Sequence, residues 1–372
     1  MAKLTMPKIN ISFSTAAASF IARGERGTVL QIIRDSALGG TSYSLLSVTD
    51  IPAALSQENQ IQVKNTFIGY VNPPKRVLLY VINSGAKNED PPGEEADGKD
   101  YTLTDALAWA ATQSFDLICG PADISAEEAE TVALWVKFKR ANDNMDILAV
   151  LPDCAADHEG VVNFVTKGIV TAAGEYTAAE YCSRVAGLIA GTPLRIGATY
   201  AVLPEVTDVE RLTEAEQDEA VGAGKFILWY DKNCVRCGRA VNSLITTTDT
   251  KGDAFKKIKI VSIVDQIAGD IRTAIHDDYI GKYANSYDNK LLVVTAIRGY
   301  LESLETDSLI NPGWTFDIDT DAQRTYLKST GVKVDDMTDQ EIREANTDTH
   351  VFLSGRLGIL DAIEDVDINF SM

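Results

Sequence analysis

The sequence predicts an α/β domain followed by an α+β domain, with an extended β-strand arm at each end. Apolar β-type runs alternate with helical patterns over residues 28–204, which is typical of a mostly parallel sheet. From about residue 205, hairpin-like runs give way to two long helical patterns. Short stretches near both ends alternate apolar and polar residues. We therefore expect an arm at 1–27, an α/β domain at 28–204, an α+β domain at 205–359 and a strand arm at 360–372.

In the first domain, uninterrupted apolar runs predict strands and amphipathic patterns predict the helices between them. Strands are expected at GTVLQII (27–33), RVLLYVI (76–82), FDLICG (115–120) and MDILAVLP (145–152). Helices are expected at QENQIQVKNTFIGY (57–70), TDALAWAAT (104–112), SAEEAETVALWVKFKRAN (125–142) and TAAEYCSRVAGLIAG (177–191). Ser125 followed by Glu128 predicts a capping box at a helix start. The polar, acidic stretch 83–100 is expected to be an exposed loop.

In the second domain, GKFILWYD (224–231) and RAVNSLITT (239–247) are two β-type runs, and KNCVRCG (232–238) between them predicts a hairpin turn. Two apolar-periodic helices are expected at 258–281 and 288–305. The polar stretch 314–350 is expected to contain short helices. Thr338 and Glu341 predict a second capping box there.

The chain is strongly acidic, with a formal net charge of −20 at pH 7. Phosphate binding depends on Lys and Arg, so this charge argues against direct nucleic-acid binding. No apolar run approaches the ~20 residues of a membrane-spanning helix, and no signal-peptide pattern opens the chain. We expect a protein that is made in the cytoplasm, or exported by lysis, and that does not insert into membranes. Its five cysteines, some in apolar contexts, fit a reducing compartment.

The motifs that resemble catalytic or binding sites are incomplete. Cys234 and Cys237 form a CxxC, but no second CxxC or HxxxH supplies a zinc site. We interpret them as two incidental thiols in a hairpin turn, with a metal shared across a subunit interface as the alternative. GAGK (222–225) lacks the phosphate-loop pattern, because Glu219 replaces the first glycine and Phe226 the hydroxyl residue.

The three histidines lie in unrelated contexts, and no GxSxG elbow accompanies them. We therefore predict no catalytic, cofactor-binding or metal-binding residues. One basic stretch, KGDAFKKIKI, interrupts the acidic background and contains Lys256, Lys257 and Lys259. It is either an exposed lead-in to a helix or a positive surface that meets an acidic partner or neighbour.

The two end segments are the most informative features of the sequence. Near the start, Ile9, Ile11 and Phe13 alternate with polar residues, and near the end the same pattern recurs. The residues that alternate near the end are Val366, Ile368 and Phe370, followed by Met372. Each strand needs a sheet edge, which lies either in its own subunit or in a neighbouring copy. The small-residue tether 14–27 could span on the order of 40 Å, which favours a neighbour for the first strand.

Several stretches of the chain resemble the tail sheath proteins of contractile bacteriophage tails and of phage-tail-like bacteriocins. They are MPKINISF, RGERGTVLQII, AAEYCSRVAGLIAGTPL, ATYAV, GRAVNSLITT, IVDQIAGDIRTAIHDDYIGKYANSYDNKLLVVTAIRGYLESL and LDAIEDVDINFSM. The resemblance implies a peripheral α/β domain, a C-terminal domain next to an inner tube, and arms that interlace neighbouring subunits. Both arm strands would then join the sheet of an adjacent C-terminal domain. Loop 83–100 and the CxxC are outside this resemblance.

The resemblance also implies a function. The chain would be a structural subunit that polymerises as stacked rings around an inner tail tube and contracts to drive the tube through a bacterial envelope. Its partners would be further copies of itself, the tube, and the baseplate and tail terminator proteins, in a virion tail or phage-tail-like particle assembled in the host cytoplasm. No catalysis or cofactor is implied. Two alternatives stay open: an α/β enzyme or small-molecule binder using residues 28–152, and a non-contractile self-assembling shell.

Overall fold

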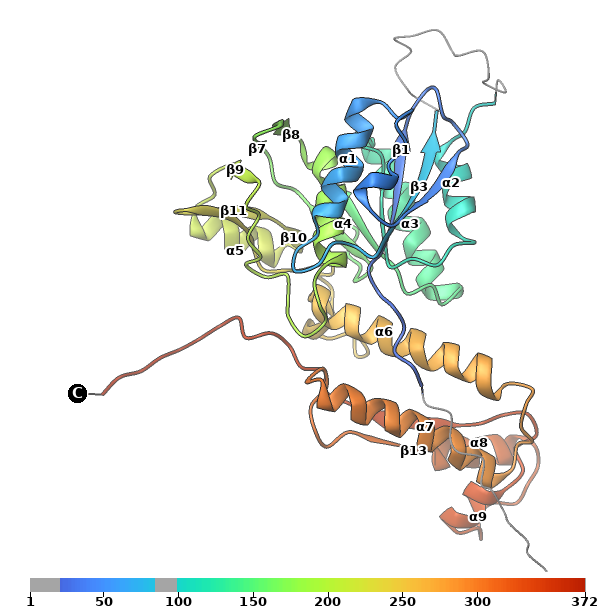
Figure 1. Ribbon diagram of the computed structural model, residues 1–372. Coiled ribbons are helices and arrows are strands. Elements are labelled where there is room, and N and C mark those ends of the chain that lie inside the picture. The colour runs from blue at the N-terminus through green and yellow to red at the C-terminus, as the bar shows by residue number, and fades with distance from the viewer. Residues whose placement is uncertain (1–20, 84–98, 372) are drawn as a thin grey trace, which may run out of the picture. The chain divides into compact units, whose positions relative to one another are not determined.

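The computed structural model describes residues 21–83 and 99–371 (Figure 1). The predicted strand with Ile9, Ile11 and Phe13 therefore lies outside the described residues, as does most of the acidic loop. The chain forms two compact units. The larger unit contains residues 24–269, 307–309 and 359–372, and the smaller unit contains the rest. Helix α6 (Ile258–Ala274) begins in the larger unit and ends in the smaller one.

The larger unit is built on one seven-stranded sheet with the order β10-β6-β5-β4-β1-β3-β2. Neighbouring strands run parallel except β2, which pairs antiparallel with β3. The mostly parallel sheet predicted from the sequence is therefore confirmed. The bounds are β1 Thr28–Arg34, β2 Ser42–Leu45, β3 Arg76–Ile82, β4 Leu117–Cys119, β5 Leu148–Pro152, β6 Val161–Phe164 and β10 Lys225–Phe226.

Helices cover both faces of this sheet, because both sides of its strands are apolar. In β3, Val77 and Leu79 pack in the same core cluster as Phe67 of α1, whereas Leu78 packs with Leu103 of α2 on the other face. Helix α3 joins α2 there, and α4 contacts α1. The predicted helices are confirmed, including the capping box of α3. Their bounds are α1 Gln57–Ile68, α2 Leu103–Ala110, α3 Ala126–Asn142 and α4 Ala178–Ala190.

Smaller elements complete the larger unit. Strands β7 (Ile169–Thr171), β8 (Gly174–Tyr176) and β9 (Val206–Asp208) form an antiparallel three-stranded sheet in the order β8-β7-β9. Helix α5 (Glu214–Gly222) has no buried residue among its nine and leads into β10. Short 3-10 turns occur at Val48–Asp50 and Asp253–Lys256.

The predicted hairpin is present, but its second strand was placed wrongly. Strand β11 (Leu228–Asp231) pairs antiparallel with β12 (Cys234–Cys237), so CVRC is itself a strand. A shorter turn at Lys232, with φ of +42°, reverses the chain. The run 239–247 is instead a connection that is buried over 240–244 and exposed over 245–247. The Ser243 backbone N–H donates to the Val161 carbonyl, and the Asn242 backbone N–H donates to the Lys256 carbonyl.

The smaller unit contains α7 and a helix-flanked hairpin. After α6, a five-residue π-helical turn, Ile275–Tyr279, leads to α7 (Tyr287–Thr306). Strands β13 (Thr315–Ile318) and β14 (Leu353–Arg356) pair antiparallel, with α8 (Thr320–Ser329) and α9 (Asp339–Glu344) between them in sequence. The predicted short helices and the capping box at Thr338 and Glu341 are confirmed.

Candidate assembly site

The N-terminal segment of the larger unit is bonded to α6, and the C-terminal segment is bonded to the residue that precedes α6. The Arg26 guanidinium donates to the carbonyl of Ser262, and the Gln266 amide donates to the carbonyl of Gly24 at 3.3 Å. Just before the helix, Lys257 Nζ lies 2.8 Å from a carboxylate oxygen of Glu364. Residues 24–26 and residue 364, which are far apart in sequence, are thus held by α6 and by the residue just before it.

The N-terminal segment is anchored through its backbone. The N–H groups of Gly27 and Thr28 donate to one carboxylate oxygen of Asp116 at 2.7 and 2.9 Å. Gly27 has φ of +113°, and a Cβ there would lie 3.2 Å from the Ala190 carbonyl oxygen. Because the positive φ is strained for any other residue and the Ala190 carbonyl is close, glycine is strongly favoured at this point. The chain upstream of Gly27 therefore leaves the sheet in a fixed direction.

The C-terminal segment is anchored through a network of charged side chains. Thr199 Oγ1 donates to Glu364 at 2.7 Å, and Lys257 Nζ lies 2.5 Å from Asp361 and 2.8 Å from Glu364. Arg239 lies 3.4 Å from Glu364 and 2.5 Å from Asp365. Burial alone lowers the pKa of Lys257, but Asp361 and Glu364 raise it above its usual value. We call this set the clasp: Thr199, Arg239, Lys257, Asp361, Glu364 and Asp365.

Beyond the clasp, residues 366–371 extend without helix or strand (Figure 1). We call them the outer segment. Val366 and Ile368 are each 67% exposed and Phe370 is 90% exposed. In the part of the chain that the structure describes, these apolar side chains pair with no strand. The strand predicted from their alternation stays a prediction, as does its partner in a neighbouring copy.

The three lysines of the predicted basic surface have contacts within the chain. Lys256 lies 2.8 Å from Asp253, and Lys257 belongs to the clasp. Lys259 is 9% exposed and donates to the Arg195 carbonyl at 3.3 Å. Burial lowers the pKa of Lys259. Contact of this surface with a tube or a neighbour stays a prediction.

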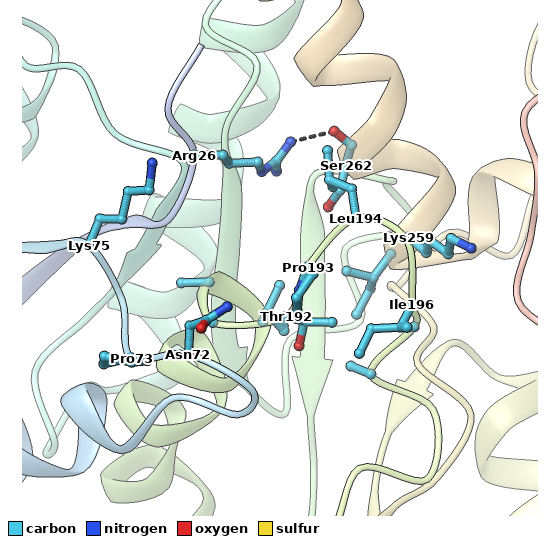
Figure 2. Close-up of a pocket in the computed structure, with 16 residues that line it drawn as sticks. Arg26, Asn72, Pro73, Lys75, Thr192, Pro193, Leu194, Ile196, Lys259 and Ser262 are labelled. Atoms are coloured by element: carbon cyan, nitrogen blue, oxygen red, sulfur yellow. Dashed lines mark hydrogen bonds between the residues drawn. The ribbon is translucent and has the colours of Figure 1, made fainter. Parts of the chain in front are cut away.

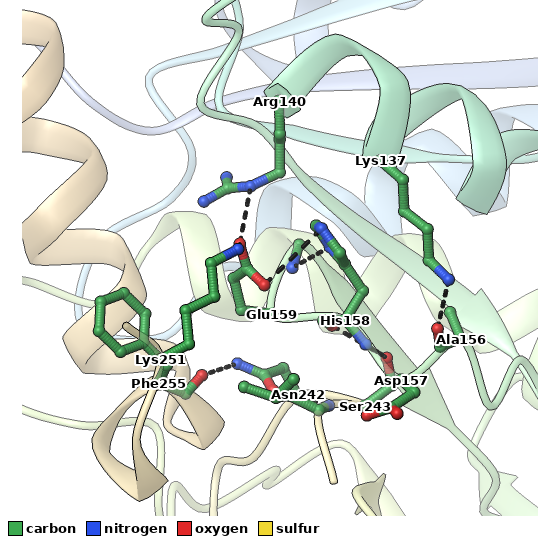
Figure 3. A network of polar contacts seen from close by, with 12 residues as sticks. Lys137, Arg140, Ala156, Asp157, His158, Glu159, Asn242, Ser243, Lys251 and Phe255 are labelled. Atoms are coloured by element: carbon green, nitrogen blue, oxygen red, sulfur yellow. Dashed lines mark hydrogen bonds and ion pairs between the residues drawn. The ribbon is translucent and has the colours of Figure 1, made fainter. Parts of the chain in front are cut away.

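A second charged network, centred on Arg140, links α6 to the sheet domain. Arg140 of α3 donates to both carboxylate oxygens of Asp265 on α6, at 2.7 and 2.9 Å. Glu159 lies 3.9 Å from Arg140 and 2.5 Å from Lys251 (Figure 3). Burial alone lowers the pKa of Arg140, but Asp265 and Glu159 raise it. Burial also lowers the pKa of His158, to about 4, so this imidazole is neutral at pH 7.

A cavity of about 220 Å³ lies beside the N-terminal anchor (Figure 2). Its wall is largely apolar and includes Pro73, Ile189 to Leu194, Ile196 to Ala198 and Ile258. Lys75 and Lys259 also line the cavity, and their ammonium groups point away from it (Figure 2). Arg26 is the third cation of the lining, and the lining contains no Asp, Glu, His or Cys side chain.

The CxxC does not form a pair. Successive side chains of a strand point to opposite faces, so Cys234 and Cys237, three residues apart on β12, face opposite sides. Cys237 is fully buried, and burial raises the pKa of its thiol to about 12. All five cysteines are free. These thiols thus lie in a strand rather than in the predicted turn.

The other sequence candidates do not converge either. His158 lies in the network of Figure 3, His276 is exposed beside Asp277, and His350 packs 4.9 Å from the Tyr326 ring. GAGK spans the end of α5 and the start of β10. Among residues 21–83 and 99–371, no group of acidic, His or Cys side chains is arranged to hold a metal ion. Within the same ranges, none of the helices has both the length and the apolar character needed to cross a membrane.

Sequence reasoning missed most of the clasp. Thr199 lies 165 positions from Glu364, and Arg239 lies 126 positions from Asp365. No local pattern marks such pairs, because the fold alone brings them together. The available signal was charge: the end segment is acidic, and Lys257 stood out in the predicted basic stretch.

Comparison with known proteins gives the same family over nearly the whole chain. A profile described as phage tail sheath protein central domain matches residues 94–243, and one described as phage tail sheath C-terminal domain matches residues 250–372. The tail sheath protein of Clostridium phage phiCD119 is 35% identical over 98% of each chain. The phage-like element PBSX protein XkdK of Bacillus subtilis is 33% identical over 46% of this chain and 37% of its own.

Solved structures have the same fold. A sheath tail protein of Desulfitobacterium hafniense superposes with a TM-score of 0.69 at 20% identity, over 84% of this chain and 94% of its own. The contracted helical sheath of the anti-feeding prophage matches with a TM-score of 0.68 at 16% identity, over 99% of both chains. The contracted sheath of the PVC extracellular contractile injection system matches with a TM-score of 0.67 at 11% identity, over 100% and 98%. Because two tail sheath profiles match most of the chain and a tail sheath protein matches it over nearly its full length, this chain belongs to the phage tail sheath protein family.

Proposed function

We propose that this chain polymerises helically around an inner tail tube and contracts to drive the tube through a bacterial envelope. The single observation that carries the proposal is the outer segment, an exposed run of alternating apolar residues attached to its subunit by the clasp. A large apolar side chain contributes about 1.5–3 kcal/mol when it becomes buried, so Val366, Ile368 and Phe370 favour docking on another surface.

A neighbouring copy offers a suitable sheet edge. Strands β13 and β14 form a two-stranded sheet in the smaller unit, and in the described chain neither outer edge pairs with a further strand. An extended segment can add to such an edge through its backbone hydrogen bonds. In our proposal the outer segment joins this sheet in an adjacent copy, and Ile9, Ile11 and Phe13 form the second added strand.

Contraction in this proposal uses conformational energy and no catalysis or cofactor. Subunits assembled on the tube are held in a metastable packing, and release at one end lets them rotate into a packing of lower energy. Strands exchanged on tethers keep the copies connected while they move. The contracted states of the two similar injection-system sheaths support this part of the proposal.

The proposal places the α/β domain 28–204 at the periphery and the domain 205–359 next to the tube. Its partners are further copies in stacked rings, the tube, and the baseplate and terminator proteins. One of the similar solved structures is a chain in the baseplate of the anti-feeding prophage, and this supports a contact between our chain and a baseplate. The particle is a virion tail or phage-tail-like particle assembled in the host cytoplasm, without nucleic-acid binding or membrane insertion.

Electron microscopy of the purified full chain, alone and with its tube protein, tests the proposal. We expect striated cylinders from the full chain, and soluble subunits without cylinders from a variant that ends at Asp365. Closed shells from the full chain would contradict the tubular assembly. Cylinders from the truncated variant as long and as frequent as those of the full chain would contradict the role of the outer segment.

A further inference from the structure

One carboxylate of the exposed end segment is buried by its own subunit. The Glu364 side chain is 7% exposed, whereas Ile363 is 90% exposed and the Asp365 side chain 78% exposed. Burial of a carboxylate is unfavourable unless hydrogen bonds and opposite charge compensate it. Glu364 receives both, from the Thr199 hydroxyl at 2.7 Å and the Lys257 ammonium at 2.8 Å. The site is therefore built around this single side chain.

The groups that hold Glu364 belong to the rigid part of the larger unit. The Ala240 backbone N–H donates to Thr199 Oγ1 at 3.0 Å, which orients the hydroxyl toward the carboxylate, and Ala240 itself is buried. Lys257 directly precedes α6, and its backbone bridges to Val241. Only Asp365 separates Glu364 from the outer segment. Because consecutive Cα atoms lie about 3.8 Å apart, the position of Glu364 fixes where the outer segment begins.

We propose that Glu364 is the positioning residue of the outer segment: the clasp sets the point and direction from which residues 366–371 leave the subunit toward a neighbouring copy. This inference rests on the proposed function, because it concerns how the outer segment reaches its partner. Without the clasp, the next backbone anchor upstream is the Leu360 N–H, which donates to the Leu309 carbonyl at 2.9 Å. The tether would then lengthen by the residues between Leu360 and Val366.

A longer tether lowers the effective concentration of the outer segment at its docking edge. Residues 361–365 would add on the order of 16 Å of reach. Effective concentration falls at least as the −3/2 power of tether length, and the freed residues must be ordered again on docking. From this relation, lengthening the tether from about six to about eleven residues slows assembly about threefold when the clasp is opened, and the ordering of the freed residues slows it further.

Glu364→Gln tests the inference, because it keeps the side-chain size and removes the charge. The matched control is Glu214→Gln, the same substitution at an exposed position of α5. Three quantities are measured: the urea midpoint of the subunit, hydrogen exchange of residues 361–365, and the rate of assembly on tubes by light scattering. For Glu364→Gln we expect only a small fall in the midpoint, because Lys257 keeps its pair with Asp361 and Arg239 keeps its pair with Asp365, together with faster exchange and slower assembly. The control should match the wild type in all three.

A second pair of variants keeps the test informative if Glu364→Gln unfolds the subunit. Thr199→Val removes the hydroxyl that donates to Glu364, while Thr199→Ser retains it. We expect slower assembly and faster exchange of 361–365 in the valine variant, and wild-type behaviour in the serine variant. A purely structural role would lower the urea midpoint of the valine variant and leave the exchange of 361–365 unchanged.

The failure of this inference differs from the failure of the proposed function. If the variant that ends at Asp365 assembles normally, the outer segment itself is dispensable. If that variant fails to assemble but Glu364→Gln and Thr199→Val assemble at the wild-type rate, the clasp does not position the outer segment. Either result is visible in the same light-scattering assay.

Discussion

Replacing Asp265 with asparagine should destabilise the larger unit strongly. Asp265 and Arg140 are 3% and 10% exposed at their side chains and form two hydrogen bonds of 2.7 and 2.9 Å. Removal of one member of a buried ion pair typically costs about 3–5 kcal/mol, because the remaining charge stays buried. Glu159, 3.9 Å from Arg140, offsets part of this loss. We therefore expect a loss of about 2–4 kcal/mol in the free energy of unfolding.

Urea unfolding followed by tryptophan fluorescence measures this loss. The control is Asp208→Asn, which removes the exposed pair with Arg211, whose side chains are 52% and 58% exposed. Exposed pairs contribute little, so the control should change stability by less than about 0.5 kcal/mol. The double variant Arg140→Met with Asp265→Leu should recover most of the loss, because it leaves no unpaired buried charge. A loss below about 1 kcal/mol for Asp265→Asn would refute this reasoning.

Three further predictions follow from the described contacts. The pKa of His158 lies at about 4, below its ordinary 6.5, so the stability that its neutral form contributes is present above pH 6.5 and is lost as the pH falls toward 4. His158→Asn should reduce the fall in urea midpoint between pH 6.5 and pH 4, and the exposed control His276→Asn should leave that fall unchanged. The same fall in both variants would contradict the low pKa of His158. Gly27→Ala should destabilise by about 1–3 kcal/mol because φ is +113° and the Ala190 carbonyl is close, and a midpoint within error of the wild type would be inconsistent with that strain. Tyr300→Phe removes the 2.6 Å hydrogen bond to the buried carboxylate of Asp270 in the smaller unit and should lower the free energy of unfolding by about 1–3 kcal/mol. No measurable change in the urea midpoint would show that this hydrogen bond does not stabilise the unit.

The order of strands and helices could be predicted because each depends on local pattern. The run RVLLYVI is apolar on both faces and became the buried strand β3, and Ser125 with Glu128 became a capping box. The end of the hairpin was missed, because CVRC looks like a turn beside the longer run 239–247. Its strand depends on pairing with β11, which includes the pair Trp229 and Arg236.

The candidate site could be predicted only in part. The alternation of apolar and polar residues in the outer segment is a local feature, and it was enough to predict that the end of the chain takes part in assembly. The clasp depends on contacts between positions more than a hundred residues apart, so no window of sequence contains it. Lys257 attracted attention for its charge, but only the fold reveals that its ammonium lies between Asp361 and Glu364.

The most direct test of the account is a structure of the assembled chain by helical reconstruction from cryo-electron micrographs. The account predicts that residues 366–371 form a strand whose backbone hydrogen bonds join the sheet of a different copy. Residues 366–371 paired with their own subunit, or making no contact with any other copy, would contradict it.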